Sequence, residues 1–392
     1  MNTRRHLISV PATRQPLSVR AVERAVSELR RGRPVVLTGA EGAAILAQAA
    51  EATTAESLLA LTETTGGIPE VAITSRRASV LGLSQTSLRG VGVSFKCASG
   101  LDQGKASKLT AELVCAFADP LSDRPLPIPT QLNVRELPAH SCEQAGLLLA
   151  KTSRLLPAAV CAPINDPSAN DVASWAGRHS YLLVDAGDIY QYDHTQARML
   201  RPVGEARVPL LGADNARVIA FRPFDGGLEH LAVILGEPPP EQAVLTRLHS
   251  ECFTGDLLGS LRCDCGDQLR GAIREITQAG GGVLLYLAQE GRGIGLVNKL
   301  RAYTLQDRGF DTLDANGQLG FDEDERVYLP AAQMLRMLGF PRVRLLTNNP
   351  AKVQALNRLG VAVEERVPHA FPTNRHNEVY LRTKAVKGGH LL

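Results

Sequence analysis

The chain has 392 residues, of which 44% are hydrophobic and 21% are charged, a composition typical of a soluble globular protein. This length suffices for two or three domains, each with a core of its own. A net charge of +3 and an aromatic content of 4% argue against nucleic-acid binding, which uses concentrated positive charge or stacking aromatic rings. The chain shows neither an apolar run of signal-peptide length nor the roughly 18 to 20 apolar residues that span a bilayer. We therefore expect a cytoplasmic protein that does not bind membranes.

The first half of the chain alternates between amphipathic helices and short apolar strands. A helical period begins after Ser18, a suitable N-cap, and ends near Gly32. Its apolar face carries Val19, Val22, Val26 and Leu29. Further helices are predicted for residues 105–119 and 143–156, and strands for residues 33–39 and 157–164.

The periodicity weakens between residues 193 and 217, and we place a domain boundary there, near Val203. The boundary divides the chain into domains 1–203 and 204–392. Beyond it, strands are predicted for residues 217–224, 281–289 and 343–349, and helices for residues 268–280, 326–340 and 350–360. This alternation predicts an α+β fold with two domains, each a mixed sheet packed with helices.

Three of the seven cysteines lie close together in the second half of the chain. They are Cys252, Cys263 and Cys265, within HSECFTGDLLGSLRCDCGDQL at residues 249–269. In a reducing cytosol such a cluster indicates a metal site or catalysis rather than disulfides. Three thiolates and one water complete the tetrahedral coordination of zinc and leave one exchangeable position, which is typical of catalytic zinc.

Two other interpretations of the cysteines stay open. His249 could be a fourth ligand and close the site, which would make it structural, or the cysteines could be unligated core residues. In the catalytic interpretation, three thiolates overcompensate the charge of zinc, so its water is less acidic than on three neutral histidines. We then expect a nearby proton acceptor.

Three further segments carry weaker signals. EGRGIGL at residues 290–296 has the glycines of a phosphate-binding loop, although a simple turn has them too. TNNPAK at residues 347–352 places a helix N-terminus and a lysine after a strand, which suits an anion or an ordinary capped helix. FDEDERVY at residues 321–328 includes Asp324 and Arg326 in an acidic cluster that a solvated turn would also explain.

Together these segments resemble GTP cyclohydrolase II of riboflavin synthesis. The resemblance covers about residues 205–392 and rests on RLHSECFTGDLLGSLRCDCGDQL, QEGRGIGLVNKLRAYTLQDRGFDTLDANGQLGFDEDER, RLLTNNPAK and KGGHLL. It implies a homodimeric zinc enzyme, with one Zn²⁺ per chain, that acts on GTP with Mg²⁺ at the phosphates. The implied reaction opens the imidazole ring at C8 and releases formate, pyrophosphate and 2,5-diamino-6-(5-phosphoribosylamino)pyrimidin-4(3H)-one.

The resemblance also implies roles for individual residues. Zinc would be held by Cys252, Cys263 and Cys265. Asp324 would be the proton acceptor, Arg326 a nucleophile towards the α-phosphorus, and Tyr303 a neighbour of the reacting ring. A guanidinium is almost always protonated, so stabilising phosphate charge is the milder role for Arg326. The implied GTP-binding residues are Arg247, Leu248, His249, Ser250, Glu251, Gln268, Glu290, Gly291, Arg292, Thr312, Thr347 and Lys352.

The first half resembles 3,4-dihydroxy-2-butanone 4-phosphate synthase, which is often fused ahead of the cyclohydrolase, in residues 30–67 and 139–166. That family binds Mg²⁺ through an acidic loop, which here is reduced to TGAEGA with Glu41 as its only acid. His140 matches the family's histidine, but a second metal-binding glutamate is absent from CAPI at residues 161–164. Because Mg²⁺ needs oxygen ligands, usually carboxylates, we expect a folded domain that has lost the synthase reaction. Its removal should leave ring opening of GTP largely intact, or alter it only through solubility and assembly.

Two alternative functions remain. A bifunctional enzyme would retain the synthase activity, and the missing acids argue against it. A regulator could bind guanine nucleotides without turnover, but such a protein has no need of the three cysteines, Asp324 and Arg326.

Overall fold

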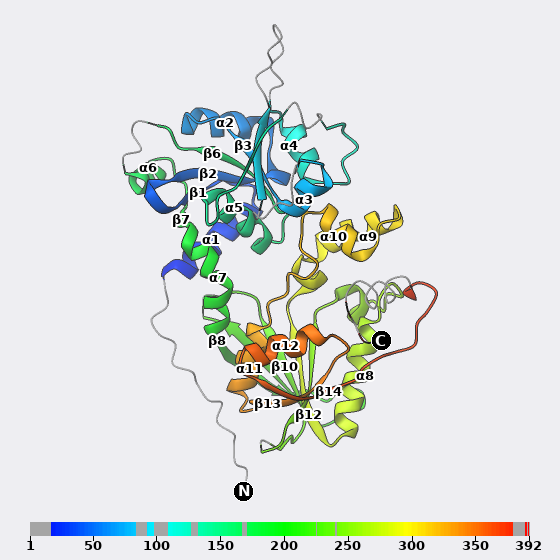
Figure 1. Cartoon of the computed structure of the whole chain (residues 1–392). Helices are drawn as coiled ribbons and strands as arrows, with labels where there is room; N and C mark the ends of the chain where they lie inside the picture. Colours follow the sequence, from blue (N-terminus) through cyan, green and yellow to red (C-terminus); the bar gives the residue numbers. More distant parts are fainter. Residues whose placement is uncertain are drawn as a thin grey trace. The chain divides into compact units, whose positions relative to one another are not determined.

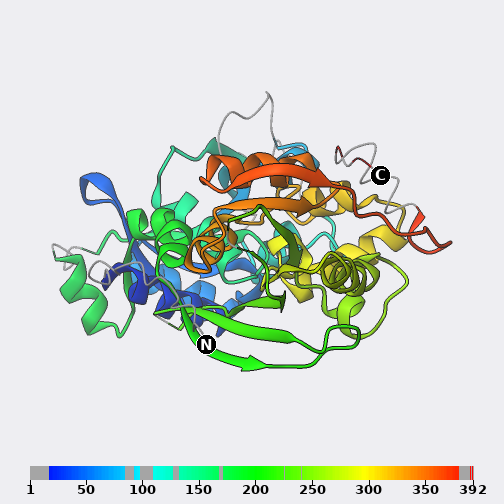
Figure 2. The ribbon, with the colours of Figure 1, turned by 90° about the horizontal axis from the view of Figure 1, so that it is seen from below.

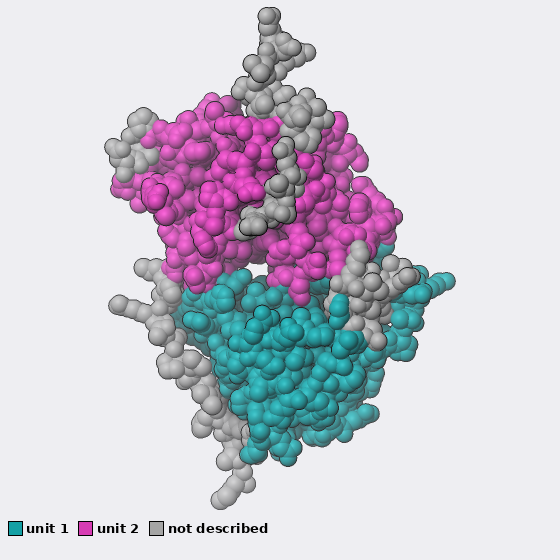
Figure 3. Space-filling model, in the orientation of Figure 1, with its two compact units in different colours: residues 1–15, 193–296, 326–392 teal, residues 16–192, 297–325 magenta. Residues whose placement is uncertain are grey.

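The computed structural model describes residues 17–83, 92–97, 109–126, 132–166, 171–224, 226–239, 241–378, 389 and 391. These residues form two compact units (Figure 3). The described part of unit 1 lies within residues 193–296 and 326–392, and that of unit 2 within residues 16–192 and 297–325. Residues 297–325 therefore interrupt unit 1 in the sequence but belong to unit 2.

Unit 2 contains a seven-stranded sheet with the order β5-β4-β3-β6-β2-β1-β7 (Figure 1). Its strands are β1 (Val35–Thr38), β2 (Ala44–Ala49), β3 (Glu70–Thr74), β4 (Gly92–Cys97), β5 (Leu132–Glu136), β6 (Ala158–Pro163) and β7 (Leu183–Asp185). The pair β1–β7 is parallel and the other neighbouring pairs are antiparallel. The sheet is therefore mixed, and β1 and β6 confirm two predicted strands.

Unit 2 contains the helices α1 (Leu17–Arg30), α2 (Ala55–Thr65), α3 (Ser75–Val80), α4 (Ala111–Ala118), α5 (Cys142–Thr152), α6 (Val172–Arg178) and α10 (Thr312–Gln318), with most of α9 (Leu296–Asp307) and the first half of α7 (Ala186–Arg198). Helices α1, α2, α3 and α5 pack against strands of the sheet. The predicted apolar face of α1 is buried, but the prediction of Ser18 as its N-cap is wrong because the helix already begins at Leu17. Helices α4 and α5 confirm two further predictions; residues 105–108 of the first lie outside the described residues.

Unit 1 contains a second seven-stranded sheet, with the order β14-β13-β11-β12-β10-β9-β8. Its strands are β8 (Leu200–Arg207), β9 (Ala216–Pro223), β10 (His230–Gly236), β11 (Val244–Ser250), β12 (Gly281–Leu287), β13 (Arg342–Leu346) and β14 (Ala362–Val367). The neighbours from β14 to β12 are parallel, and the remaining pairs are antiparallel. This sheet is also mixed.

Helices cover both faces of the sheet of unit 1. Helices α11 (Leu329–Met337) and α12 (Pro350–Arg358) pack on one face, where Ile234 is buried. Helix α8 (Cys265–Gln278) packs on the other, where the next residue along β10, Leu235, is buried. Adjacent side chains of a strand point to opposite faces, so a central strand such as β10 contributes to both core layers. Figure 2 shows α12 alongside β14, which it contacts.

The stretch of weak periodicity is nonetheless structured. It contains the end of α7 and the whole of β8, in which only Leu200 is buried. An edge strand that faces water lacks an apolar alternation, which explains the weak signal. Two mixed sheets packed with helices confirm the α+β class with two domains. No helix of the described residues has the length and apolar character of a membrane span.

Candidate active site

The predicted site residues of unit 1 gather at the carboxyl ends of three parallel strands. Strand β11 carries Arg247 to Ser250 and continues into Cys252, β12 leads to Glu290, and β13 leads to Thr347. The carboxyl ends of parallel strands lie at the same edge of a sheet, which is where ligands bind in open α/β sheets. The fold therefore brings together residues that are up to about a hundred positions apart in the sequence.

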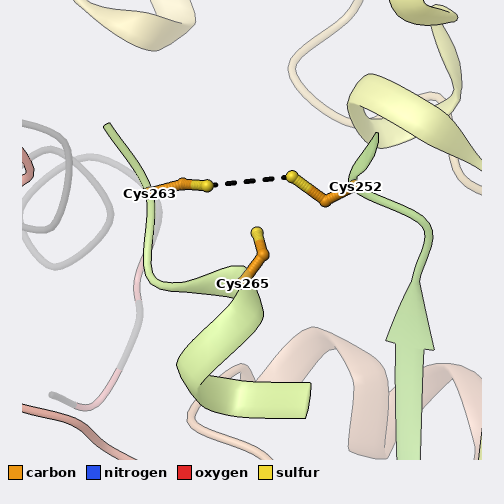
Figure 4. A group of neighbouring side chains, drawn as sticks. All are labelled: Cys252, Cys263 and Cys265. Atoms are coloured by element: carbon orange, nitrogen blue, oxygen red, sulfur yellow. Dashed lines mark hydrogen bonds between the residues drawn. The ribbon is translucent and has the colours of Figure 1, made fainter. Parts of the chain in front are cut away.

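The three cysteines converge at this edge (Figure 4). Cys252 follows β11, Cys265 begins α8, and the Sγ atoms of all three lie within 4.8 Å of one another. The Sγ atoms of Cys252 and Cys263 are 3.7 Å apart. Tetrahedral zinc with Zn–S bonds of ~2.3 Å would separate its thiolates by ~3.8 Å, so the arrangement fits zinc.

The packing around the thiols supports a metal site. Gly255 lies in a single helical turn, η4 (Phe253–Leu257), and a Cβ on it would come within 2.8 Å of Cys263 Sγ. The neighbouring Cys252 raises the pKa of Cys263 to about 11, and these two thiols raise the pKa of Cys265 well above its ordinary value. Three sulfurs this close ionise together only when a cation compensates their charge. The donor set is therefore that of a soft divalent metal such as zinc.

Asp256, in the same turn, organises the Cys252 end of the cluster. Its carboxylate accepts hydrogen bonds from the Cys252 backbone N–H and the Tyr286 hydroxyl, both at 3.0 Å. It also lies 3.0 Å from Nε2 of His249, whose pKa is lowered mainly by burial. The neutral ring therefore carries its proton on Nε2, and this N–H donates a hydrogen bond to Asp256. His249 is outside the group of potential metal ligands found among the described residues, so the closed site with His249 as fourth ligand is not supported.

We expect Asp256→Asn to weaken zinc binding about 10- to 100-fold, the usual effect of changing a residue that orients metal ligands. An amide is neutral and cannot accept all three hydrogen bonds. Competition with a chelator measures the affinity, and Asp267→Asn, an exposed acid on α8, is the control that should bind zinc like wild type. Wild-type zinc affinity in Asp256→Asn would contradict this role.

Arg247 holds a buried positive charge beside the cysteines. Its Nη1 donates to the Leu346 carbonyl at 2.9 Å, and Nη2 donates to the side-chain oxygen of Gln268. The Gln268 amide in turn donates to Asp264 at 2.5 Å. Burial lowers the pKa of Arg247 to about 10, against the opposing effect of Asp264, so the guanidinium stays charged at neutral pH.

Several buried polar atoms at the strand ends lack a hydrogen-bond partner among the described residues. They are Nε of Arg247, Nδ1 of His249, Oγ of Ser250 and Oε1 of Gln289. Buried polar groups are nearly always paired, so this group indicates atoms that a ligand would satisfy. Sequence reasoning did not include Gln289, Asp256 or Tyr286. The available signals were the position of Gln289 next to Glu290 and of Asp256 inside the cysteine loop.

Glu290 connects the turn after β12 to the cysteine loop. Its buried carboxylate accepts hydrogen bonds from the backbone N–H groups of Phe253 at 2.6 Å and Gly291 at 2.7 Å. In the turn η5 (Glu290–Gly293), Gly291 and Arg292 are both left-handed, with φ of 64° and 62°. This conformation costs a non-glycine residue about 1–2 kcal/mol, and such strain is concentrated at functional sites. The segment is thus more than a simple glycine turn.

The segment after β13 is a capped helix start. Asn349 caps α12 by accepting from the Ala351 N–H at 2.9 Å, and Pro350 occupies the first turn as predicted. Thr347 accepts from the Asn349 N–H at 3.0 Å, and Lys352 Nζ donates to the Leu248 carbonyl at 3.1 Å. The Leu248 side chain packs in the core. Glu251 donates its N–H to the Leu287 carbonyl at 2.8 Å.

Three predicted residues, Tyr303, Thr312 and Asp324, belong to unit 2. Tyr303 lies on α9, where its ring centroid is 5.7 Å from Nζ of Lys299. Thr312 begins α10, and Asp324 is exposed in the loop that follows this helix. Arg326 belongs to unit 1, where its positive charge contributes to the lowered pKa of Arg247.

The fold and the site define a two-domain α+β protein with a three-cysteine centre of the kind that holds a catalytic metal. The family model for GTP cyclohydrolase II matches residues 201–368. A GTP cyclohydrolase-2 of Azospirillum brasilense is 53% identical over 375 residues, which cover 95% of this chain and 94% of that protein. The chain belongs to the GTP cyclohydrolase II family, and it is therefore an enzyme of riboflavin biosynthesis, as the sequence motifs predicted.

Two other relatives show how the halves of the chain are distributed. A GTP cyclohydrolase-2 of Cronobacter sakazakii is 52% identical over 193 residues, which cover 49% of this chain and 98% of that protein. A protein of Salinispora tropica named riboflavin biosynthesis protein RibBA is 37% identical over 395 residues, which cover 95% of this chain and 98% of that protein. Relatives thus occur both with and without a counterpart of the first half.

Proposed function

We propose that this protein is a zinc-dependent GTP cyclohydrolase II. It would hydrolyse GTP to 2,5-diamino-6-(5-phosphoribosylamino)pyrimidin-4(3H)-one, formate and pyrophosphate. The observation that carries the proposal is the convergence of Cys252, Cys263 and Cys265 at the strand ends that also bear buried, unpaired polar atoms. Membership of the family supports the same reaction.

The three cysteines would hold one Zn²⁺ per chain. His249 lies outside the group of candidate ligands among the described residues, which leaves a fourth coordination position for a small molecule. When bound, zinc supplies Lewis-acid activation of water for attack at C8. Mg²⁺ would accompany the GTP phosphates, since a hard cation prefers phosphate oxygens to thiolates.

The residues at the strand ends would bind GTP. Nδ1 of His249 can accept a hydrogen bond and Oγ of Ser250 can donate one, so both suit the edges of a purine or a ribose. Arg247 and Arg326 bring two positive charges that suit phosphates. The other proposed GTP-binding residues are Leu248, Glu251, Gln268, Glu290, Gly291, Arg292, Thr312, Thr347 and Lys352, with Leu248 acting through its backbone.

Proton transfer and charge stabilisation would use three further residues. Asp324 would accept the proton of the attacking water. Tyr303 would lie near the reacting ring. Arg326 remains protonated, so it would stabilise negative charge that develops on the α-phosphate when pyrophosphate leaves.

Incubation of the zinc-loaded protein with GTP and Mg²⁺ tests this proposal. Mass spectrometry should identify the diaminopyrimidine product, with formate and pyrophosphate released in equal amounts. GTP recovered unchanged at full zinc content would favour the regulator that binds guanine nucleotides without turnover.

We propose that the first half has lost the synthase reaction. Glu41 is exposed in a turn, and the segment matched to the second metal-binding glutamate contains Cys161, a buried residue of β6. The full chain incubated with ribulose 5-phosphate and Mg²⁺ should therefore yield no 3,4-dihydroxy-2-butanone 4-phosphate. Formation of that product would establish the bifunctional alternative.

We also propose a cytoplasmic homodimer that binds neither nucleic acid nor membranes, and a division of the chain into domains 1–203 and 204–392. The low net charge and aromatic content support the absence of nucleic-acid binding. The start of the family match at residue 201 supports the position of this division.

A further inference from the structure

Residues 297–325, called here the arm, lie within the stretch matched by the cyclohydrolase family model but belong to unit 2 (Figures 1 and 3). The arm contains most of α9, the whole of α10 and the loop that follows. It carries three of the proposed active-site residues, Tyr303, Thr312 and Asp324. Its partners in unit 2 come from the N-terminal part of the chain, residues 16–192, called here the N-terminal domain.

Arg77, in the N-terminal domain, forms a hydrogen bond to the arm. It is 4% exposed, and its Nε donates to the Phe117 carbonyl at 2.8 Å and its Nη1 to the Gln318 carbonyl at 2.9 Å. These carbonyls lie in the last turns of α4 and α10, where carbonyls lack partners within the helix and the helix dipole is negative. Burial lowers the pKa of Arg77 to about 10, partly opposed by Asp119, so the side chain is charged at neutral pH. One buried cation thus binds the ends of two helices.

The backbone of the arm lies directly against the N-terminal domain just beyond α10. The Thr74 hydroxyl donates to the Gly320 carbonyl at 2.6 Å. Gly320 has a φ of +87°, and a Cβ on it would lie 3.0 Å from both Pro157 Cγ and Thr74 Oγ1. The close approach therefore requires glycine at this position.

Ion pairs anchor the loop on both sides of Asp324. Lys151 Nζ lies 2.7 Å from Glu325 and 3.4 Å from Asp322, and Arg76 Nε lies 3.1 Å from Asp322. The Lys151 and Glu325 side chains are 18% and 19% exposed, so solvent screens this pair less than a surface pair. Burial opposes ionisation of Asp322, but Lys151 and Arg76 outweigh it and lower its pKa. The backbone that presents Asp324 is therefore held at residues 322 and 325.

Helix α9 is anchored as well. The Asn298 side chain donates to the Arg154 carbonyl at 3.1 Å. Arg301 lies 3.3 Å from Glu51 and 3.7 Å from Asp119. Both ends of the arm are thus bound to the N-terminal domain.

We propose that the N-terminal domain acts as a holder that positions the arm for ring opening, with Arg77 and Lys151 as positioning residues. This inference rests on the proposed function, because Asp324, Tyr303 and Thr312 matter only if they act in that reaction. It revises the expectation that removing this domain leaves turnover largely intact. The Cronobacter relative matches over only 49% of this chain, so the proposed positioning concerns chains that carry the N-terminal domain.

The test uses Arg77→Met and Lys151→Met in the full chain, with hydrogen exchange and steady-state kinetics as measurements. Exchange of amides in residues 297–325 should become at least about tenfold faster in Arg77→Met, because local stability depends on such buried contacts. Misplacing a reacting group by about 1 Å can cost about 10²-fold in rate, so we expect kcat to fall by about 10- to 100-fold. Zinc content and exchange in β11 to β13 should not change. Lys151→Met should show the same effects more weakly, centred on residues 320–325.

Two control variants separate positioning from general destabilisation. Arg217→Met removes an ion pair with Glu205 at 2.7 Å in unit 1 and should leave arm exchange and kcat at wild-type values. Arg77→Lys keeps the charge without the planar fork that binds both helix ends, so it should restore part of kcat.

If the wild-type protein turns over GTP and both Arg77→Met and Lys151→Met have unchanged kcat, the positioning proposal is overturned and the proposed function stands. Unchanged arm exchange in both variants would overturn the positioning proposal as well, because the contacts would then not hold the arm. A wild-type protein that binds zinc but does not open the ring of GTP would instead overturn the proposed function, and with it any positioning for that reaction.

Discussion

Cys263→Ser should lose zinc and, with it, the ring opening of GTP. Cys263 belongs to the three-thiol group, and a serine hydroxyl is a poor replacement for a thiolate on a soft metal. Changes to residues that only orient metal ligands cost about 10- to 100-fold, so loss of a ligand should cost more than that. Elemental analysis of the purified variant and a GTP turnover assay measure the two effects, from about one zinc per chain in wild type to almost none.

Cys115→Ser is the matched control for this variant. Cys115 is a half-buried residue of unit 2 whose thiol lies 3.5 Å from the Ala50 carbonyl, outside the three-thiol group. This variant should keep zinc and turnover. Full activity in a zinc-free Cys263→Ser protein would contradict the assignment of the metal centre.

Asp324→Asn should lower kcat by about 10²-fold or more, the usual contribution of a general base. The amide keeps the shape of the side chain but cannot accept a proton. Affinity for GTP should change far less, because the proposed phosphate contacts are made by other residues. Rapid-mixing turnover and equilibrium binding of GTP separate the two quantities.

Glu323→Gln is the control for this experiment, because Glu323 is an exposed acid next to Asp324 in the same loop. It should turn over like wild type. Equal rates for wild type and Asp324→Asn would contradict a catalytic role. Asp324 would then be only one acidic residue of a solvated turn.

Elements with a strong local pattern could be predicted from the sequence. The apolar face of α1 recurs at helical spacing and is buried, and Pro350 and Gly360 delimit α12 closely. Strand β8 gave almost no signal, because most of its residues face water at the edge of the sheet. Local sequence thus predicts an element well when its own residues form part of a core.

The chemistry of the cysteines could also be predicted, because three ligands lie within fourteen positions of the sequence. The long-range contacts around the site and the arm could not be predicted. The contact of Asp256 with Tyr286 spans thirty residues, and the bond of Arg77 to Gln318 spans 241. Such contacts depend on tertiary packing, and no local pattern encodes them. For the same reason, no sequence pattern predicted that the arm, which resembles one family, packs with a domain that resembles another.

GTP labelled at C8 provides the most direct test of the central claim, that the cysteine centre opens the purine ring. The label should appear in formate when the zinc-loaded protein acts on this substrate. It should stay in GTP when the protein has been stripped of zinc, and zinc added back should restore release. Label retained in the nucleotide by fully zinc-loaded protein, or formate released equally well without zinc, would contradict the account.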